Sequence, residues 1–284
     1  MRLSCVILTA GGRQAELDRA VRSVHAQEGA DVEVVVVGNG AAVPRLSEPV
    51  KELRLPSNAG IPGGRNHGVA ACAGDVVLFL DDDGWYPSRG LAARVAREFE
   101  AGPSLAVLSF RVQDPEGRGP ARRHVPRLRA DPDRSGAVTT FLGGACAIRR
   151  AAFEAVEGLP GEFFYSHEET DFAWRVLDAG YRIRYDAEAV MCHPAVTPSR
   201  HEYFYRLNAR NRVWLARRNL PWPLAACYLA DWVAITLARE RSTAARRAWF
   251  AGFAEGWRAS CGPRRPISWR TAWTMTKAGR PPIV

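Results

Sequence analysis

Short apolar runs alternate with amphipathic segments along the first two hundred residues of the chain. Runs of consecutive apolar residues predict strands that are buried on both faces of a parallel sheet. Segments with apolar residues every three or four positions predict helices that pack one face on such a sheet. The predicted strands cover residues 2–9, 32–37, 50–55, 76–80, 105–110 and 181–185, and the predicted helices cover residues 16–27, 65–73, 91–100 and 168–177. This alternation predicts a Rossmann-like α/β fold with a mostly parallel central sheet flanked by helices.

Two stretches depart from this pattern. Residues 113–136 are polar, rich in Pro, Arg and Gly, and weakly periodic, so we interpret them as a long excursion or a mobile loop. Beyond residue 199 the pattern predicts long helices rich in Trp and Arg, broken at Pro221-Trp222-Pro223. We therefore expect one domain over residues 1–200 and a basic, aromatic-rich helical region over residues 201–284.

The C-terminal region carries most of the positive charge. From residue 200 onward there are 16 basic and 4 acidic residues, a net charge of +12, whereas the whole chain has a net charge of +9. A basic tail of this kind favours an anionic partner, and helices with Trp and Arg on different sides can lie on an anionic membrane surface. The alternative is a helical appendage that packs on the first domain and exposes arginine to solvent. No recognition motif supports nucleic-acid binding, so no nucleic-acid partner is expected.

Composition bears on the location of the chain. The six cysteines are scattered and form no C-x-x-C pair, so neither a zinc site nor a disulfide framework is predicted. Met1-Arg2 leads straight into the apolar run Leu3–Leu8, which is too short for an export segment. Together these features predict a reducing, cytoplasmic location.

The run Val76–Leu80 ends abruptly in Asp81, Asp82 and Asp83. The carboxyl ends of strands are where open α/β sheets bind ligands. Three adjacent carboxylates repel one another unless a cation holds them, and hard divalent cations take oxygen ligands. Alternate residues of an extended chain point the same way, so the first and third acids can converge on one ion. A solvated acidic turn is the alternative interpretation.

Several further motifs follow one another in order. They are Asn58-Ala59-Gly60, Gly63-Gly64-Arg65-Asn66, Gly74-Asp75, the acidic triplet, Gly143-Gly144, the pair Glu168-Glu169 with Asp171 and Arg175, and finally His193. In this order and spacing the set resembles the family 2 inverting glycosyltransferases of the GT-A fold, over residues 2–215. Within that family it is similar to rhamnosyltransferases and galactofuranosyltransferases.

The resemblance implies a divalent metal, Mn²⁺ or Mg²⁺, held by Asp81, Asp83 and His193. Such a metal bridges the phosphate oxygens of a nucleoside diphosphate and neutralises the charge that builds there as this group leaves. Asp81 and Asp82 are also implied to approach the donor nucleotide. An isolated histidine is more often structural, so a structural role for His193 stays open.

The resemblance also implies a catalytic base at the second acid of the glutamate pair, Glu169, where the family usually has aspartate. An inverting transfer needs a base that takes the acceptor proton on the face opposite the leaving group. Glu168 and Asp171 complete the catalytic set, with Glu168 as the alternative base, and their like charges are expected to raise the pKa of Glu169. An ion pair between Asp171 and Arg175, four residues apart, can brace the site. Acids that merely favour a helix N-terminus are the alternative.

The donor nucleotide is expected to contact Thr9, Arg13, Asn39 and Arg65, with the last at the start of a helix that can approach the diphosphate. Two positions depart from the family pattern. Gly38 stands where the family usually has an aspartate that contacts the base, and the first turn is Thr9-Ala10-Gly11-Gly12-Arg13, without the usual tyrosine. The nucleotide therefore stays open among uridine, thymidine and guanosine.

The leading hypothesis is a metal-dependent, inverting glycosyltransferase. It would move a sugar from a UDP-, dTDP- or GDP-linked donor to a hydroxyl of a glycan, a lipid-linked saccharide or a small natural product. A sugar nucleotidyltransferase is the runner-up, although the Gly-Thr-Arg continuation of its Gly-rich opening is missing. A non-catalytic protein that binds a nucleotide sugar or docks at a membrane is the third hypothesis. The expected location is cytoplasmic, with peripheral contact at the inner membrane face as a further expectation.

Overall fold

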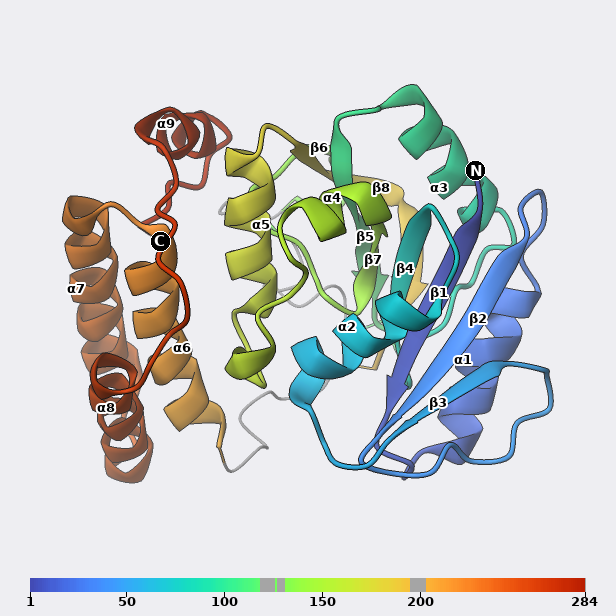
Figure 1. Cartoon of the computed structure of the whole chain (residues 1–284), viewed down its shortest axis with the longest axis horizontal. Helices are drawn as coiled ribbons and strands as arrows, with labels where there is room; N and C mark the ends of the chain where they lie inside the picture. The colour runs from blue at the N-terminus through green and yellow to red at the C-terminus, as the bar shows by residue number, and fades with distance from the viewer. Residues whose placement is uncertain (118–125, 127–130, 195–202, 284) are drawn as a thin grey trace.

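The computed structural model of the chain describes residues 1–117, 126, 131–194 and 203–283. Within these ranges a single sheet of eight strands forms the centre of the molecule, in the order β3-β2-β1-β4-β7-β5-β8-β6 (Figure 1). The strands are β1 (Leu3–Thr9), β2 (Val32–Asn39), β3 (Lys51–Leu55), β4 (Val76–Asp81), β5 (Leu105–Gln113), β6 (Gly136–Ala137), β7 (Ala145–Arg149) and β8 (Arg182–Cys192). Only β7 and the short β6 pair antiparallel to their neighbours. The prediction of a mostly parallel sheet is therefore confirmed.

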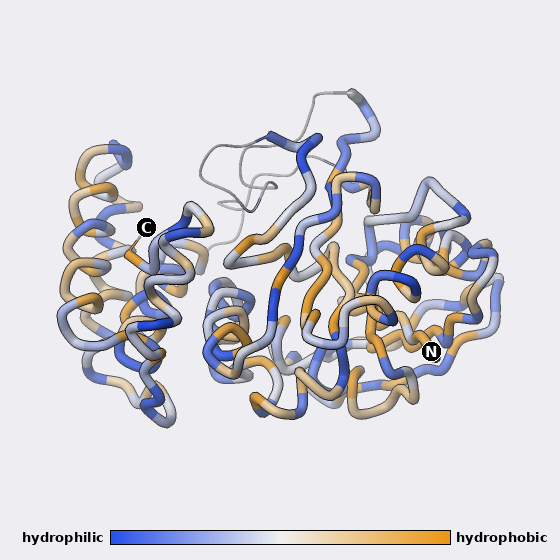
Figure 2. The backbone as a smooth tube through the Cα atoms, turned by 90° about the horizontal axis from the view of Figure 1, so that it is seen from above, coloured by the Kyte–Doolittle hydropathy of each residue, from blue (hydrophilic) through white to orange (hydrophobic). Residues whose placement is uncertain are grey.

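Helices cover both faces of the sheet because alternate residues of each strand point to opposite faces. On one face, Leu78 packs in a core with α1 (Gln14–His25) and α3 (Leu91–Ala101). On the other face, Phe79 packs in a second core with α2 (Gly60–Ala71), α4 (Arg150–Ala155) and α5 (Glu168–Asp178). Figure 2 shows the strands as a largely hydrophobic centre between these layers. A short 3-10 helix, η2 (Gly161–Phe163), leads towards α5.

The C-terminal region forms the helices α6 (Phe204–Asn219), α7 (Trp222–Arg239), α8 (Thr243–Arg258) and α9 (Trp269–Lys277), which stand beside α5 (Figure 1). Leu220, Ile267 and Met275 are buried in the same core as the residues of α5. Gly252 and Gly256 let α8 lie against the backbone of α6, since a Cβ at Gly252 would be 2.0 Å from a carbonyl oxygen of α6. In the described part of the chain, no helix combines the length and the apolarity needed to cross a bilayer.

Two element boundaries differ from the sequence prediction. Helix α2 begins at Gly60 rather than near residue 65, because Gly60 adopts a positive φ of 73° and its neighbour Ile61 donates a backbone hydrogen bond to Phe164 O. Strand β8 runs on to Cys192 through a register shift opposite β5, beyond the end of the strand predicted at residues 181–185. Half of the predicted excursion at 113–136 lies outside the described residues.

Candidate functional site

The acidic triplet at the end of β4 meets the first turn of the chain, because β1 and β4 are parallel neighbours that end at the same edge. Thr9 Oγ1 donates a hydrogen bond to Asp82 Oδ2 at 2.9 Å. The Arg13 guanidinium pairs with Asp82 Oδ1 at 3.1 Å and also with Asp83. Burial raises the pKa of Asp82, although the hydrogen bond from Thr9 and the charge of Arg13 oppose this shift. Four of the expected donor-site and metal-site residues are thus brought together.

His193 lies beside the triplet because it directly follows the last residue of β8. Trp85 and Cys192 exchange two backbone hydrogen bonds of 3.0 and 2.9 Å, which hold the chain after the triplet against the end of β8. His193 Nε2 is 3.0 Å from Asp83 Oδ1 and 3.9 Å from Asp81 Oδ2. Burial disfavours the charged form of both Asp83 and His193, but their mutual hydrogen bond outweighs it. The pKa of Asp83 is therefore lowered and that of His193 raised.

The donor set of Asp81, Asp83 and His193 fits a divalent cation in its chemistry. Two carboxylate oxygens and an imidazole nitrogen face one another, and His193 Nδ1 lies 2.6 Å from Pro194 O, which orients the ring with Nε2 towards the carboxylates. Among the described residues, however, no group of three acidic, cysteine or histidine side chains is already assembled in ligating geometry. Arg13 and Arg65 take the remaining carboxylate oxygens, so a cation would have to share or displace these contacts.

Arg65, on α2, connects the acidic triplet to the glutamate pair. Its side chain is 6% exposed, with Nη2 3.1 Å from Asp81 Oδ1 and Nη1 3.6 Å from Glu169 Oε1. Nη1 is buried without a hydrogen-bond partner. The two carboxylates therefore lie on either side of one guanidinium, which places the expected metal side and the expected base side of the site next to each other.

Gly143 and Gly144 form the floor between these two sides. A Cβ at Gly144 would lie 2.0 Å from Asp81 Oδ2, and a Cβ at Gly143 would lie 2.2 Å from Glu169 Oε1 and 2.3 Å from Arg65 Nη1. A side chain at either glycine would therefore force the facing carboxylate or guanidinium group to move. The sequence interpretation of a tight backbone at which a sugar or acceptor can approach closely fits this geometry.

The glutamate pair occupies the first turn of α5. Glu168 is 1% exposed and its Oε2 has no hydrogen-bond partner. Burial, followed by the charge of Glu169, raises the pKa of Glu168 to about 8. The side chain of Glu169 is 23% exposed and faces the cavity, and burial raises its pKa against the opposing charge of Arg65. The sequence attributed this rise to like charges, whereas the main cause in the structure is removal from water.

The segment before the glutamate pair is held in an uncommon conformation. Phe164, Ser166 and His167 have φ values of 63°, 74° and 71°, a left-handed region that non-glycine residues rarely adopt. Asn211, fully buried on α6, donates hydrogen bonds to the carbonyls of residues 163, 165 and 166 at 2.8–2.9 Å. Such strain persists where surrounding contacts over-determine it, often at functional sites. The sequence gave no signal for this role of Asn211.

Asp171 is not brought to the cavity, which corrects its expected place in the catalytic set. Its carboxylate is fully buried and points towards α6, where Asn219 Nδ2 lies 2.6 Å and Arg218 Nε 3.1 Å from Oδ1. The other oxygen, Oδ2, pairs with Arg175 at 2.6 Å, so the expected ion pair is formed. Asp171 thus orients α5 against α6 and does not face a substrate.

Asn39 is also engaged elsewhere. Its amide donates to Asn58 Oδ1 and to Gly60 O at 3.0 and 3.1 Å and accepts from Ala59 N at 2.8 Å, so it fixes the turn before α2. The preceding Gly38 has no room for the aspartate of the family pattern, because a Cβ there would be 2.3 Å from Ala41 O. Asn39 is therefore not available to contact the nucleotide base, and Gly38 offers no side chain for that contact.

A cavity of about 530 Å³ joins the two sides of the site. Arg65, Asp81, Glu168, Glu169 and His193 all line it. Phe204 and Asn208 of α6 line it as well, which the division at residue 200 did not anticipate. The arrangement offers oxygen and imidazole ligands at one end and a carboxylate of raised pKa at the other, with a guanidinium and a bare glycine backbone between them. This is a set that can hold an anionic leaving group beside a proton acceptor.

Solved structures share the fold. The chain is similar to S. aureus TarS 1–349 in complex with UDP, with a TM-score of 0.60 and 19% identity, covering 90% of this chain and 80% of that one. It is also similar to the mannosyltransferase PcManGT of Pyrobaculum calidifontis in complex with GDP-Man and Mn²⁺, with a TM-score of 0.58 and 16% identity over 98% of this chain and 84% of that one. These likenesses show a shared fold, and the second covers nearly the whole chain.

Curated relatives match part of the chain. A pre-mycofactocin glycosyltransferase of Mycobacterium tuberculosis is 30% identical over 56% of this chain and 37% of its own length. The O-antigen chain rhamnosyltransferase RfbN of Salmonella typhimurium is 28% identical over 50% of this chain and 48% of its own length. The chain thus spans less than half of the length of these two relatives. Residues 5–157, more than half of the chain, match the description "Glycosyl transferase family 2". The chain belongs to glycosyl transferase family 2.

Proposed function

We propose that this chain is a metal-dependent, inverting glycosyltransferase that moves a sugar from a nucleotide-linked donor to an acceptor hydroxyl. The observation that carries the proposal is the position of Arg65 between Asp81 and Glu169, beside a glycine pair where any side chain would displace these groups. A donor diphosphate bound at the triplet would lie on one side of the sugar, and the base on the other. Family membership favours this hypothesis over a nucleotidyltransferase.

Asp81, Asp83 and His193 would hold Mn²⁺ or Mg²⁺. When bound, the cation neutralises charge on the departing diphosphate. Thr9 and Arg13 fix Asp82 at the same edge of the sheet, and Arg65 Nη1 is a buried donor that has no hydrogen-bond partner among the described residues. Binding of a polyanionic donor would satisfy this donor atom and offset the cost of burying it. The solved relatives that carry UDP, or GDP-Man with Mn²⁺, support such a ligand.

Glu169 would take the proton of the acceptor hydroxyl. Its raised pKa brings it nearer to the pH at which a general base is efficient, and its exposure to the cavity lets an acceptor reach it. Glu168 lies behind it, more deeply buried, and Asp171 serves as a positioning residue. The strained segment at residues 164–167, fixed by Asn211, would hold Glu169 in place.

The chemical classes of the sugar donor and of the acceptor can be stated more narrowly. We propose a UDP-, dTDP- or GDP-linked donor and transfer of a hexosyl or deoxyhexosyl unit, of the rhamnosyl or galactofuranosyl type. The similarity to a rhamnosyltransferase supports this class. Because no side chain fits at Gly38, the nucleotide base would be recognised by other groups. The acceptor would be a glycan, a lipid-linked saccharide or a small molecule.

We also propose a cytoplasmic protein whose helical region contacts an anionic membrane surface. Trp222, Trp257, Trp269 and Trp273 are 46–61% exposed on a region of high positive charge. Exposed tryptophan together with arginine is typical of helices at a membrane interface. Residues 1–200 would form the catalytic domain and residues 201–284 this region, with α6 serving both because it lines the cavity.

Two variants test the proposal together. Glu169→Gln should bind the nucleotide as the parent does and lose transfer by roughly 10²–10⁴-fold, as expected for loss of a general base. Asp83→Ala should lose metal-dependent nucleotide binding as well. Glu154→Gln, an exposed acid on α4, is the matched control. Transfer is measured as release of the nucleoside diphosphate, and binding by calorimetry. Parent-rate transfer by Glu169→Gln would show that the base is assigned wrongly.

A further inference from the structure

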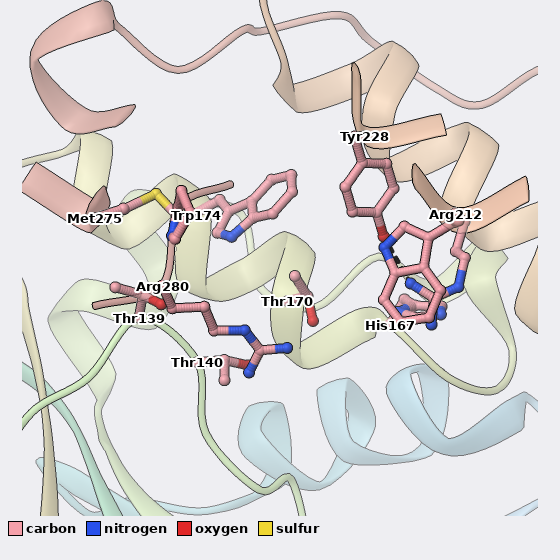
Figure 3. A pocket seen from close by; sticks show the side chains of 11 residues that line it. Thr139, Thr140, His167, Thr170, Trp174, Arg212, Tyr228, Met275 and Arg280 are labelled. Carbon is pink, nitrogen blue, oxygen red and sulfur yellow. Dashed lines mark hydrogen bonds between the residues drawn. The ribbon is translucent and has the colours of Figure 1, made fainter. Parts of the chain in front are cut away.

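A second cavity of about 120 Å³ lies between α5 and the C-terminal helices (Figure 3). Its lining includes Thr139 and Thr140 from the loop before β7, His167 and Thr170 from the start of α5, Arg212 from α6, Tyr228 and Trp232 from α7, and Met275 and Arg280 from α9 and its end. Roughly 10–15 Å³ is enough for one water molecule, so the cavity has room for a small solute.

Two positive charges line the cavity. They belong to Arg212 and Arg280, and none of the Asp and Glu side chains that the structure describes lines it with them. Among the described residues, neither guanidinium forms an ion pair with a carboxylate. Burial lowers the pKa of both groups, and the positive charge of Arg280 lowers that of Arg212 further. Buried charges are normally paired, so two arginines that face one cavity without a carboxylate partner in the described part of the chain favour an anionic ligand there.

The two arginines are held differently. Arg212 is 9% exposed and is fixed by hydrogen bonds to Tyr228 Oη at 3.0 Å and Asn208 Oδ1 at 3.1 Å, while its guanidinium stacks 3.2 Å from the Trp232 ring centroid. Arg280 has no side-chain hydrogen bond within the described ranges, and its guanidinium points towards Thr140 and Thr170 in Figure 3. Arg212 is thus a preorganised hydrogen-bond donor. Among the described residues, the guanidinium group of Arg280 still has its N–H groups free to bind a ligand.

Unpaired hydrogen-bonding atoms surround these charges. Three buried atoms have no hydrogen-bond partner among the described residues. They are Oγ1 of Thr139, which is 3% exposed, Nε1 of Trp232 and Nε2 of His167. The hydroxyl and the indole N–H can each donate a hydrogen bond. These atoms come from three separate elements of the chain yet line the same cavity. Their convergence describes a site with many donors for a ligand with many acceptor oxygens.

The cavity adjoins the proposed catalytic site. His167 and Thr170 line both cavities, and the base Glu169 lies between them in the sequence. A ligand group held in the second cavity would therefore lie on the acceptor side of the base. It would be separated from the metal side of the site by the glutamate pair and Arg65.

We propose that this second cavity binds a phosphoryl group carried by the acceptor. The proposal rests on the proposed function, because it names the acceptor of that same site. A phosphoryl group carries close to two negative charges and three acceptor oxygens, which match two guanidiniums and the surrounding donors. A carboxylate would neutralise one guanidinium only. The acceptor is thus a sugar that carries a phosphate monoester, because a phosphodiester, like a carboxylate, would bring only one negative charge.

Binding of inorganic phosphate tests the site without metal, donor or acceptor, so its outcome is independent of whether sugar transfer occurs. Titration calorimetry should show that Arg280→Gln weakens phosphate binding at least tenfold and that Thr139→Val weakens it by a smaller factor. Arg270→Gln, an exposed arginine of α9, and Arg13→Gln, at the acidic triplet, should bind phosphate as the parent does. Unchanged binding by Arg280→Gln, or loss of binding in Arg13→Gln, would overturn the proposal.

Folding of the variant is checked in the same samples. Without phosphate, Arg280→Gln should melt at the same temperature as the parent or higher, because an unpaired, half-buried charge is removed. With phosphate, only the parent should gain thermal stability. A lower melting temperature of the variant without phosphate would mean that Arg280 stabilises the fold itself and that the cavity needs no anion.

The source of the phosphoryl group is tested with sugar phosphates. Hexose 1-phosphate should bind at least tenfold more tightly than inorganic phosphate, and the free hexose should not bind measurably. Arg280→Gln should remove the advantage of the sugar phosphate. Equal affinity for inorganic phosphate and hexose 1-phosphate would indicate a site for the free anion, and would contradict the assignment to the acceptor.

Discussion

The two ends of the site differ in whether their arginines pair with carboxylates. At the end of β4, Arg13 and Arg65 pair with the carboxylates of the acidic triplet. Beyond the glutamate pair, Arg212 and Arg280 face a cavity that no carboxylate lines. The charges at the first end oppose one another, so this end can admit a cation together with a polyanion. The described residues at the second end bring positive charge, which favours an anion. The difference indicates which ligand chemistry each end accepts.

The two ends also differ in how the chain builds them. The donor end comes from strands and turns whose residues are close together in sequence or at adjacent strand ends, such as Asp81–Asp83 and Thr9. The acceptor end depends on contacts that α5 and the segment before it make with residues of α6 more than forty positions later, such as Asn211 and Asn219. Variants at each end should therefore fail in different ways.

Among the variants that compare the two ends, the largest effect is expected from Gly144→Ala at the donor end. The new Cβ would lie 2.0 Å from Asp81 Oδ2, so the carboxylate must move away from the position that faces His193. Misplacement of a ligand by about 1 Å can cost roughly 100-fold in rate, and we expect a loss of that order in both metal-dependent nucleotide binding and transfer. Gly161→Ala, where a Cβ meets no atom within 4 Å, is the control. Equal donor binding by Gly144→Ala and the parent would break the comparison.

A smaller effect is expected from Asn211→Ala at the acceptor end. Three carbonyl groups of the strained segment lose their donor, which should lower the free energy of unfolding by about 1–3 kcal/mol. Because the hydrogen bonds that Asn211 donates go to the segment before the glutamate pair, kcat should fall while the affinity for the nucleotide stays unchanged. Arg206→Ala, which removes an exposed ion pair, should change neither quantity. A change in nucleotide affinity equal to the loss in kcat would show that the two ends are not separable.

The smallest effect on transfer is expected from Glu168→Gln, whose main consequence is for stability. The pKa of Glu168 is raised from 4.5 to about 8 in the folded chain. The folded state therefore holds a proton that the unfolded state has released, and this contribution to stability is complete below pH 4.5 and is lost as the pH rises towards 8. Urea unfolding from pH 5 to 8 should show a decline for the parent that is flatter for Glu168→Gln. Parallel profiles would show that Glu168 is ionised in the fold.

Much of the fold and of the donor end could be predicted from the sequence, because the relevant signals are local. The apolar run of β4 and the acids after it lie within eight residues, and strand alternation places Thr9, Arg13 and His193 near them. Gly38 was recognised as a departure, and the structure explains it through the crowding by Ala41.

The acceptor end was less accessible to sequence reasoning. Asp171 was expected in the catalytic set because it shares a helix turn with the glutamate pair. The direction of its side chain is set instead by Asn219 and Arg218, which lie far along the chain. Asn39 was taken as a nucleotide contact, but the turn before α2 uses its hydrogen bonds. Contacts of this kind depend on which helix packs against which, and no periodicity along the sequence encodes it.

The most direct test of the account is the melting temperature of the parent protein with Mn²⁺ and each of UDP, dTDP, GDP and CDP. A ligand that binds only the folded state raises this temperature. The account predicts a rise with one nucleotide that requires Mn²⁺ and that Asp83→Ala abolishes. No rise with any nucleotide, or a rise that is independent of Mn²⁺, would contradict the claim that the acidic triplet and His193 form a metal-dependent donor site.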